Sequence, residues 1–174
     1  MYNRATVYIL ISILIVSVRA VRNDFFRSGP KNYYISPIKT NFFAARDHCI
    51  AHGADLATFD SIADLEAVSN FLIQHGYNSE SNDLFWVSYW DLGRAQGLFH
   101  SIATGQLLTT SGWTHGQPDN AGGVEHCVQI WKRNGQYGMN DNNCNVNLRA
   151  LCQQRTYFFP QKCCQYGHQN GNCN

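Results

Sequence analysis

Apolar residues recur at two different spacings along the chain, and together they predict both helices and strands. Residues 31–36 are rich in aromatic and β-branched side chains, which is typical of a strand. Phe42, Ala45 and Cys49 recur at helical spacing and predict a helix that buries them on one face. Gly53 follows this run and is expected to end the helix.

The middle of the chain predicts a second helix, a buried strand and a long loop. The helix is expected to begin at Asp60 or Ser61, which suit an N-terminal cap, and to end at Gly76. Residues 84–90 are mostly apolar and aromatic and predict a central strand. Residues 91–112 are rich in glycine and predict a long loop with one or two short strands. Loops of this length usually carry function.

A β-hairpin is predicted near the C-terminal end of this pattern. Two strand-like runs are separated by Asn134 and Gly135, and Asn-Gly between such runs is the strongest short hairpin signal. A two-residue turn at these positions brings Glu125, before the first run, towards Asn140 and Asp141 in the second. A closing strand is expected at residues 149–153.

Five side chains around this hairpin can each offer an oxygen atom to a metal ion. They are Gln117, Asp119, Glu125, Asn140 and Asp141. Carboxylate and amide oxygens without a soft donor are the ligands that Ca²⁺ takes, at a coordination number of about six to eight. These residues therefore predict a calcium site.

Composition and charge narrow the classes of function and the number of domains that the sequence allows. The chain has 174 residues and a formal net charge of +1, and charged residues make up 14% of it. There is no clustered basic patch in the sequence, so no nucleic-acid partner is expected. The length is sufficient for one domain with its own core.

The N-terminus predicts a secretory signal peptide at residues 1–20. Arg4 precedes an apolar run at residues 7–18, and small or compatible residues end at Ala20. The run is shorter than the roughly 20 residues that a membrane-spanning helix needs. We therefore expect a secreted, extracellular protein without a membrane anchor; a retained anchor is the competing interpretation.

Seven cysteines in a secreted chain indicate disulfides, although the sequence alone leaves their connectivity open. Three of them, Cys163, Cys164 and Cys173, lie in a C-terminal tail at residues 156–174. This tail is interpreted either as a poorly ordered end or as a disulfide-bonded segment. In the second case Cys173 bonds Cys163 or Cys164, and the remaining thiol links two chains into a homodimer.

From about residue 31 to residue 154 the chain resembles the C-type lectin-like domain. The resemblance rests on four cysteines in order and spacing, an aromatic-aliphatic strand motif, a Gln-Pro-Asp tripeptide and an Asn-Asp pair. These are Cys49, Cys127, Cys144 and Cys152, then Phe85-Trp86-Val87, Gln117-Pro118-Asp119 and Asn140-Asp141. It implies an α+β fold over residues 31–155 with two helices, small antiparallel sheets and a long calcium- and sugar-binding loop region. It also implies the disulfides Cys49–Cys152 and Cys127–Cys144.

The resemblance implies a function as well as a fold. In this family a cis peptide bond before the proline directs the side chains of residues such as Gln117 and Asp119 at one Ca²⁺ ion. The same five oxygen-bearing residues then bind both the ion and a sugar. In this family Gln-Pro-Asp is associated with galactose-type ligands, so the resemblance implies that the chain binds such glycans. The chain also resembles secreted insect C-type lectins, which implies a role in innate immunity. No nucleophile–base motif is present in the sequence, so an enzyme is not expected.

Three departures from the family pattern bear on affinity. Residues 120–124 contain no aromatic side chain to stack on a sugar, so we expect weak binding by a single domain. At the auxiliary calcium site of some members, Asp91 is suitably placed, but Gln96 and Asn120 stand where acids are preferred. Met139 replaces a tryptophan that is common before Asn-Asp. The alternative function is a secreted protein–protein interaction or reproductive-fluid module with this fold and no sugar binding.

Overall fold

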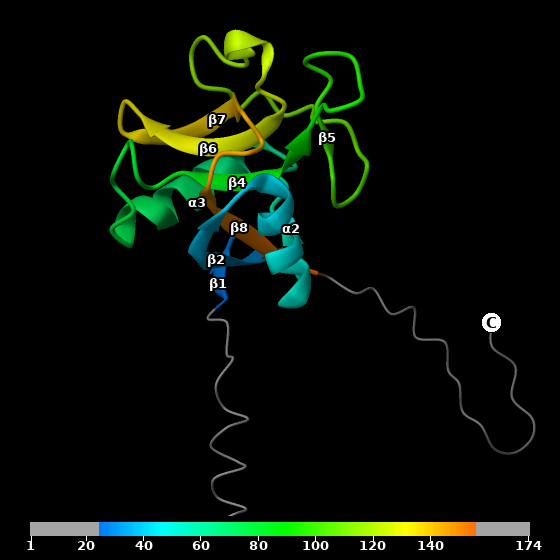
Figure 1. Ribbon diagram of the computed structural model, residues 1–174. Coiled ribbons are helices and arrows are strands. Elements are labelled where there is room, and N and C mark those ends of the chain that lie inside the picture. Colours follow the sequence, from blue (N-terminus) through cyan, green and yellow to red (C-terminus); the bar gives the residue numbers. More distant parts are fainter. Residues whose placement is uncertain (1–24, 156–174) are drawn as a thin grey trace, which may run out of the picture.

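A computed structural model describes residues 25–155 of the protein (Figure 1). The expected signal peptide at 1–20 and the cysteine-containing tail at 156–174 lie outside the described residues. Within the described part, no helix is long and apolar enough to cross a membrane.

One mixed sheet forms the centre of the fold. Its strands are β1 (Phe26–Ser28), β2 (Lys31–Thr40), β3 (Ala54–Leu56), β4 (Phe85–Trp90), β5 (His100–Ser101), β6 (Cys127–Arg133), β7 (Gln136–Asn142) and β8 (Leu148–Gln154). The order is β1-β2-β8-β4-β6-β7, with β3 added to β8 and β5 added to β4. All pairs are antiparallel except β4 and β8, which are parallel. The α+β class is confirmed, but the expected small antiparallel sheets are joined into one sheet through that parallel pair.

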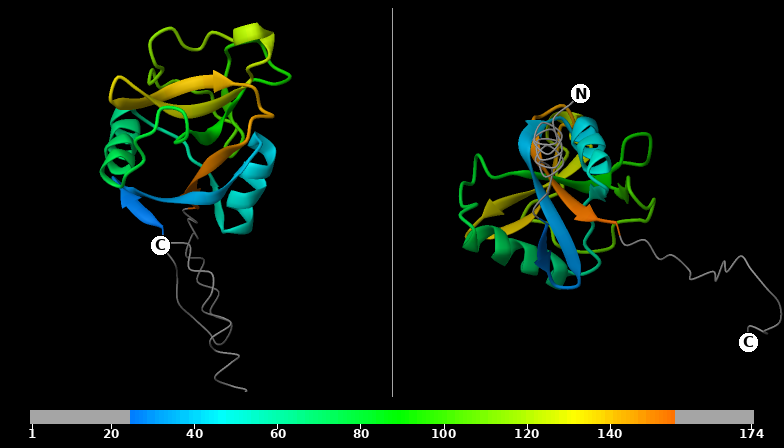
Figure 2. Two further views of the ribbon diagram at one scale, coloured as in Figure 1. Left: turned by 60° about the vertical axis from the view of Figure 1, so that its left-hand side comes forward. Right: turned by 90° about the horizontal axis from the view of Figure 1, so that it is seen from below.

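The two α-helices of residues 25–155 begin at residues with capping side chains. Helix α2 (Phe42–Ala51) follows Asn41, whose Oδ1 accepts from the amide of Ala44 at 2.9 Å. Helix α3 (Ile62–Gln74) follows Ser61, whose Oγ accepts from the amide of Asp64 at 3.2 Å. These bonds satisfy amides that have no partner inside the helix. The helices lie on opposite sides of β2 (Figures 1 and 2).

Strand β4 is buried on both faces, which explains its continuous apolar sequence. Phe85, Val87 and Tyr89 point into one core cluster, together with residues of α3. Trp86 points into a second cluster, which contains Phe42 of α2 and all four cysteines of the described residues. The two faces of one strand therefore organise the two halves of the core.

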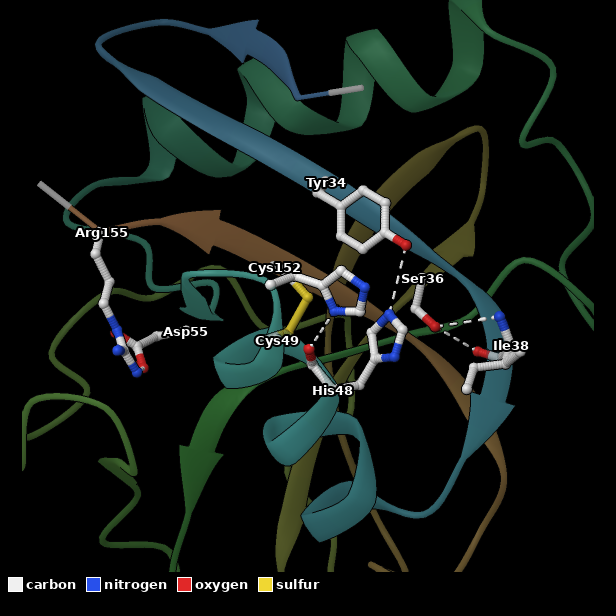
Figure 3. Close-up of a disulfide and its surroundings, with 9 residues drawn as sticks. Tyr34, Ser36, Ile38, His48, Cys49, Asp55, Cys152 and Arg155 are labelled. Carbon is white, nitrogen blue, oxygen red and sulfur yellow. Dashed lines mark hydrogen bonds and ion pairs between the residues drawn. A yellow bond between two sulfur atoms is a disulfide. The ribbon is translucent and has the colours of Figure 1, made fainter. Parts of the chain in front are cut away.

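Residues 25–155 contain two disulfides, and both have the pairing that the resemblance implies. Cys49–Cys152 joins α2 to β8, and Figure 3 shows it beside Tyr34 and His48. Cys127–Cys144 joins the start of β6 to the segment after β7. The second bond therefore closes the open end of the β6–β7 hairpin.

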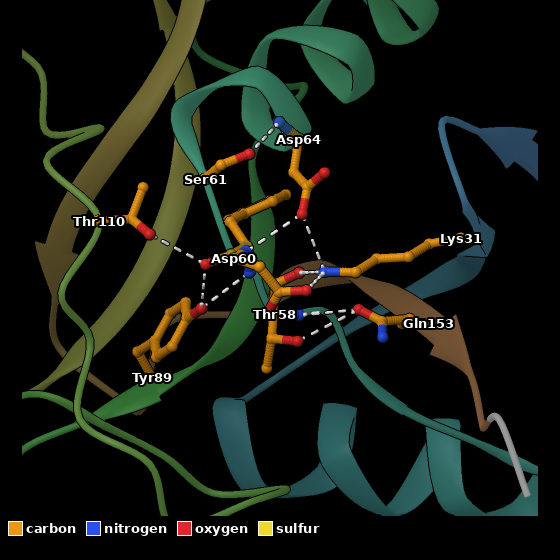
Figure 4. Close-up of polar contacts among 9 residues, drawn as sticks. Lys31, Thr58, Asp60, Ser61, Asp64, Tyr89, Thr110 and Gln153 are labelled. Carbon is orange, nitrogen blue, oxygen red and sulfur yellow. Dashed lines mark hydrogen bonds and ion pairs between the residues drawn. The ribbon is translucent and has the colours of Figure 1, made fainter. Parts of the chain in front are cut away.

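A polar network fixes the start of α3 against β2 (Figure 4). The Lys31 ammonium, with a side chain only 12% exposed, lies 2.8 Å from Asp60 Oδ2 and 3.0 Å from Asp64 Oδ2. The Tyr89 hydroxyl accepts from the amide of Phe59 and donates to its carbonyl oxygen. Because these partners are distant in sequence, the network holds the first helix turn to the sheet.

The predicted hairpin register is confirmed. Gln129 pairs with Asn140 and Val128 pairs with Asp141 across β6 and β7. The expected central and closing strands are also present, as β4 and β8. The short strands β1 and β3 were not predicted.

Candidate calcium and sugar site

The β6–β7 hairpin supplies one arm of the candidate site. Asn140 and Asp141 lie near the C-terminal end of β7, away from the hairpin turn, and are almost fully buried, at 5% and 1% exposure. Glu125 lies two residues before β6 and is half-buried. Since Val128 faces Asp141 and Cys127 faces Asn142, the strand pairing carries Glu125 to the end of β7.

The loop at residues 114–120, which is hydrogen-bonded to β7, supplies the other arm of the site. The amide of Thr114 donates to the carbonyl of Met139 at 3.0 Å, and the amide of Gln117 donates back to the carbonyl of Thr114 at 3.0 Å. The Gln117–Pro118 peptide is cis, as the resemblance implies. The loop therefore leaves β7 at Thr114 and presents Gln117 and Asp119 beside the hairpin residues.

The carboxylate of Asp141 connects the two arms. Its Oδ1 accepts from the amide of Asp119 at 3.1 Å, and its Oδ2 accepts from the amide of Asn120 at 2.8 Å. Hydrogen bonds to an ionised acceptor are about twice as strong as neutral ones. Asp141 thus stabilises the loop and is also one of the candidate calcium ligands.

A short turn returns the loop to the hairpin. Asn120 is left-handed, with φ of 44°, and precedes the 3₁₀ turn η1 (Ala121–Gly123). Its Oδ1 accepts from the amide of Glu125 at 2.9 Å, and the amide of Ala121 donates to Glu125 Oε2 at 3.2 Å. These two bonds turn the Glu125 carboxylate towards the other acids.

Negative charge is concentrated in this space. Carboxylate oxygens of Asp119, Glu125 and Asp141 all lie within 4.8 Å of one another. Burial raises the pKa of Glu125, and the nearby charges of Asp141 and Asp119 raise it further. Burial also raises the pKa of Asp141, with a smaller contribution from Asp119. A cation among these groups would relieve both the repulsion and part of the desolvation.

Two amide oxygens complete the set of candidate calcium ligands, and neither has a hydrogen-bond partner among the described residues. Gln117 Oε1 and Asn140 Oδ1 are buried and have no hydrogen-bond partner among residues 25–155. A buried acceptor without a partner costs about 1–3 kcal/mol, so such atoms call for an explanation. Both belong to the five residues that the sequence nominated. Carboxylates and free amide oxygens together form a donor set that fits Ca²⁺.

The candidate ligands border a cavity of about 660 Å³ that continues beyond them. Gln117, Asp119, Glu125 and Asn140 line one part of it. Trp131 lines another part, and the sequence pattern did not indicate it because the stacking aromatic was expected only in residues 120–124. The available signal was the alternation along β6, which places Trp131 on the same face as Gln129.

Asp91 and Asn120, which the sequence placed at the auxiliary calcium site of some family members, have protein partners in the structure. Asp91 is buried, and its Oδ1 lies 2.9 Å from His126 Nδ1. Its Oδ2 accepts from the amide of Gly97 at 2.8 Å. These contacts connect the start of the loop after β4 to His126, directly before β6, while Asn120 Oδ1 accepts from the amide of Glu125.

The chain belongs to the C-type lectin family. The model of the lectin C-type domain matches residues 38–154, which is most of the described part and includes all five candidate ligands.

Individual relatives and solved structures agree with this assignment. The chain is 38% identical over 125 residues to C-type lectin 37Db of Drosophila melanogaster, covering 72% of this chain and 78% of that protein. It is 29% identical to lectin subunit alpha of Sarcophaga peregrina, covering 90% of this chain and 58% of that protein. The crystal structure of the C-type lectin CEL-I from Cucumaria echinata superposes with a TM-score of 0.63 at 22% identity, covering 78% and 97%. The last comparison shows that the fold is shared.

Proposed function

We propose that this lectin binds glycans through one Ca²⁺ ion held by Gln117, Asp119, Glu125, Asn140 and Asp141. The observation that carries the proposal is the pair of buried amide oxygens on Gln117 and Asn140, which lack partners in the described fold and adjoin three clustered carboxylates. When bound, Ca²⁺ would supply coordination for two sugar hydroxyls, since five side chains leave positions open.

The protein's own side chains would hold the same sugar by hydrogen bonds. Ionised carboxylates only accept hydrogen bonds, whereas the amides of Gln117 and Asn140 can donate through NH₂. This combination suits hydroxyl groups, which donate and accept at once. We propose galactose-type glycans because Gln117-Pro118-Asp119 resembles the motif associated with them. Binding would be reversible and would involve no chemical step.

Affinity chromatography tests this proposal directly. The disulfide-bonded protein is applied to galactose-agarose and to mannose-agarose in calcium buffer, and each column is then washed with EDTA. We expect retention on galactose-agarose, release by EDTA, and little retention on mannose-agarose. Absence of calcium-dependent retention on any sugar would favour the alternative of a protein–protein interaction or reproductive-fluid module.

The cellular setting is also part of the proposal. We propose that residues 1–20 are a signal peptide and that the protein is extracellular, where it binds glycans of microbes or host cells and acts in innate immunity. We further propose that a tail cysteine links two chains, because two sites on one molecule raise avidity for clustered glycans. Gels run with and without reductant test the dimer: a monomer in both would exclude it.

A further inference from the structure

The cavity beside the candidate calcium ligands extends along β6. Gln129, Trp131 and Arg133 alternate on one face of this strand and all line the cavity. Gln129 is the cross-strand partner of Asn140, so the row begins directly beside a candidate ligand. From the strand rise, the row continues for about 13 Å away from it. Glu80 and Ser81, which precede β4, line the same cavity.

Gln129 points to a ligand in this part of the cavity. It is 1% exposed, and its Oε1 has no hydrogen-bond partner in the part of the chain that the structure describes. It is not among the five candidate calcium ligands, so the ion does not account for it. A buried amide oxygen that lines a cavity is satisfied when an occupant donates a hydrogen bond to it.

Trp131 and Arg133 form a combined aromatic and polar surface above Gln129. The guanidinium of Arg133 lies 4.0 Å from the centre of the Trp131 ring. The indole N–H donates to Thr114 Oγ1 at 2.8 Å, which holds the ring in place. The guanidinium therefore covers one face of the held indole, and its N–H groups can donate to hydroxyls of a ligand.

The charges in this region identify the class of occupant. Apart from the candidate calcium ligands, the charged side chains that line the cavity are Glu80 and Arg133, and they compensate each other. They lie 3.6 Å apart and are about half exposed, so their ion pair is weak and leaves both groups available to a ligand. An occupant rich in hydroxyls and without charge matches this lining.

We propose that this part of the cavity, formed by Gln129, Trp131 and Arg133, binds the second, neutral sugar residue of a galactose-terminated glycan. The inference rests on the proposed function, because the terminal galactose would occupy the calcium site. The volume of about 660 Å³ lies within the range of sites that enclose ligands larger than one hexose. The lectin thus recognises a disaccharide unit, and its second contact compensates for the missing aromatic after Gln117-Pro118-Asp119.

Titration calorimetry in calcium buffer tests the second subsite. Methyl β-galactoside is compared with lactose, N-acetyllactosamine, lacto-N-biose and melibiose, which carry galactose in different linkages. At least one disaccharide should bind about tenfold more tightly than methyl β-galactoside, since a hydrogen bond from a charged group such as the Arg133 guanidinium contributes on this scale.

Two charge-removing variants on opposite faces of β6 locate the effect. Arg133→Met should bring the ratio of disaccharide to monosaccharide affinity close to one. Lys132→Met removes the same charge from the other face, where Lys132 bonds Asn78, and should keep the ratio of the unmodified protein. Gln129→Leu should also lower the ratio, whereas Trp131 is a poor choice because its N–H holds Thr114.

The outcomes separate this inference from the proposed function. If galactoside binds in a calcium-dependent manner but no disaccharide exceeds it, or if Arg133→Met keeps the advantage, the second subsite is wrong and the proposed function stands. If no saccharide binds in calcium buffer, the proposed function fails and the subsite fails with it.

Discussion

At the scale of single residues, the site combines groups that have hydrogen-bond partners in the fold with groups that have none. The Asp141 carboxylate accepts two backbone hydrogen bonds and so shapes the loop. The amide oxygens of Gln117 and Asn140 accept none from residues 25–155. The sequence nominated these residues through their oxygen atoms and family resemblance. It did not reveal this division of roles, which depends on where the backbone amides of the loop point.

Neutralising Glu125 should have opposite effects with and without calcium. Burial and neighbouring acids raise the pKa of Glu125, so its ionised form destabilises the calcium-free fold at neutral pH. Glu125→Gln should therefore leave the melting temperature in EDTA unchanged or higher. In calcium at about a hundred times Kd, it should lose the roughly 2.7 kcal/mol of ligand-induced stabilisation.

Thermal melts with calcium and with EDTA measure both effects. Glu66→Gln is the matched control, because Glu66 is exposed on α3, and it should keep the full calcium shift. A full shift in Glu125→Gln would place the ion elsewhere.

Gly138 is required by the close approach of the loop to β7. A Cβ atom at this position would lie 2.6 Å from Thr114 Cγ2 and 3.3 Å from the Thr114 amide nitrogen. Gly138→Ala should therefore displace Thr114, destabilise the fold by about 1–3 kcal/mol as overpacking does, and weaken calcium binding through Gln117. Urea unfolding and calcium titration measure the two losses.

A second substitution tests the cause of this loss. Thr114→Ser removes Cγ2 but keeps the hydroxyl that bonds Trp131 and Met139. In the Gly138→Ala background it should restore part of the stability, because the two changes act on one contact. Simple additivity of the two losses would show that the contact is not the cause.

At the scale of elements, structure that depends on local sequence could be predicted, whereas strand pairing that depends on distant segments could not. The Asn134-Gly135 turn sets the hairpin register by itself, so the pairing of Gln129 with Asn140 followed from sequence. Strands β1 and β3 are three residues long and have no periodicity to recognise. Strand β1 adds to the outer edge of β2, and β3 adds to the part of β8 that extends beyond its pairing with β4. The availability of these positions depends on the whole sheet.

His48 of helix α2 (Figure 3) and His52, which follows the helix, form a pair whose protonation should oppose folding. The rings of His48 and His52 are tilted against each other with centres 4.2 Å apart, and Tyr34 stacks on both. Burial lowers the pKa of His48, and the charge of His52 lowers it further. The unfolded chain thus binds a proton at higher pH than the fold does, and stability falls as pH drops from the usual histidine pKa to the lowered value.

His48→Gln should reduce this loss of stability. Melting temperatures measured between about pH 7 and pH 5, where histidine titrates, should fall less steeply than in the unmodified protein. His75→Gln, at an exposed position after α3, provides the control and should leave the slope nearly unchanged. A proton NMR titration would contradict the argument if the His48 ring titrated above the ordinary histidine range.

At the scale of the whole molecule, the site lies far from the ends of the described chain. The β6–β7 hairpin and its loops form one end of the fold, and β1 lies at the other (Figure 1). The fold class was predictable because the cysteine framework and motifs span most of the domain. The single continuous sheet was not, since the parallel pairing of Phe85 with Arg149 joins segments that carry no mutual sequence signal.

The two disulfides of the described chain join cysteines at very different sequence separations, and removing each should have a different consequence. Cys49 and Cys152 are 103 residues apart, whereas Cys127 and Cys144 are 17 apart. In the chain-entropy model the longer loop contributes about 4.7 kcal/mol and the shorter one about 3 kcal/mol. Both pairs lie in the same core cluster, so paired Cys→Ala variants create comparable cavities.

Urea unfolding and calcium titration of the two paired variants should therefore rank them in opposite orders. The Cys49/Cys152 variant should lose more stability, because its bond restricts nearly the whole described chain. The Cys127/Cys144 variant should lose more calcium affinity, because its bond holds Glu125 and Asp141 at the closed end of one hairpin. If the Cys49/Cys152 variant lost more calcium affinity at temperatures where both are folded, the site would depend on the global sheet and not on the hairpin.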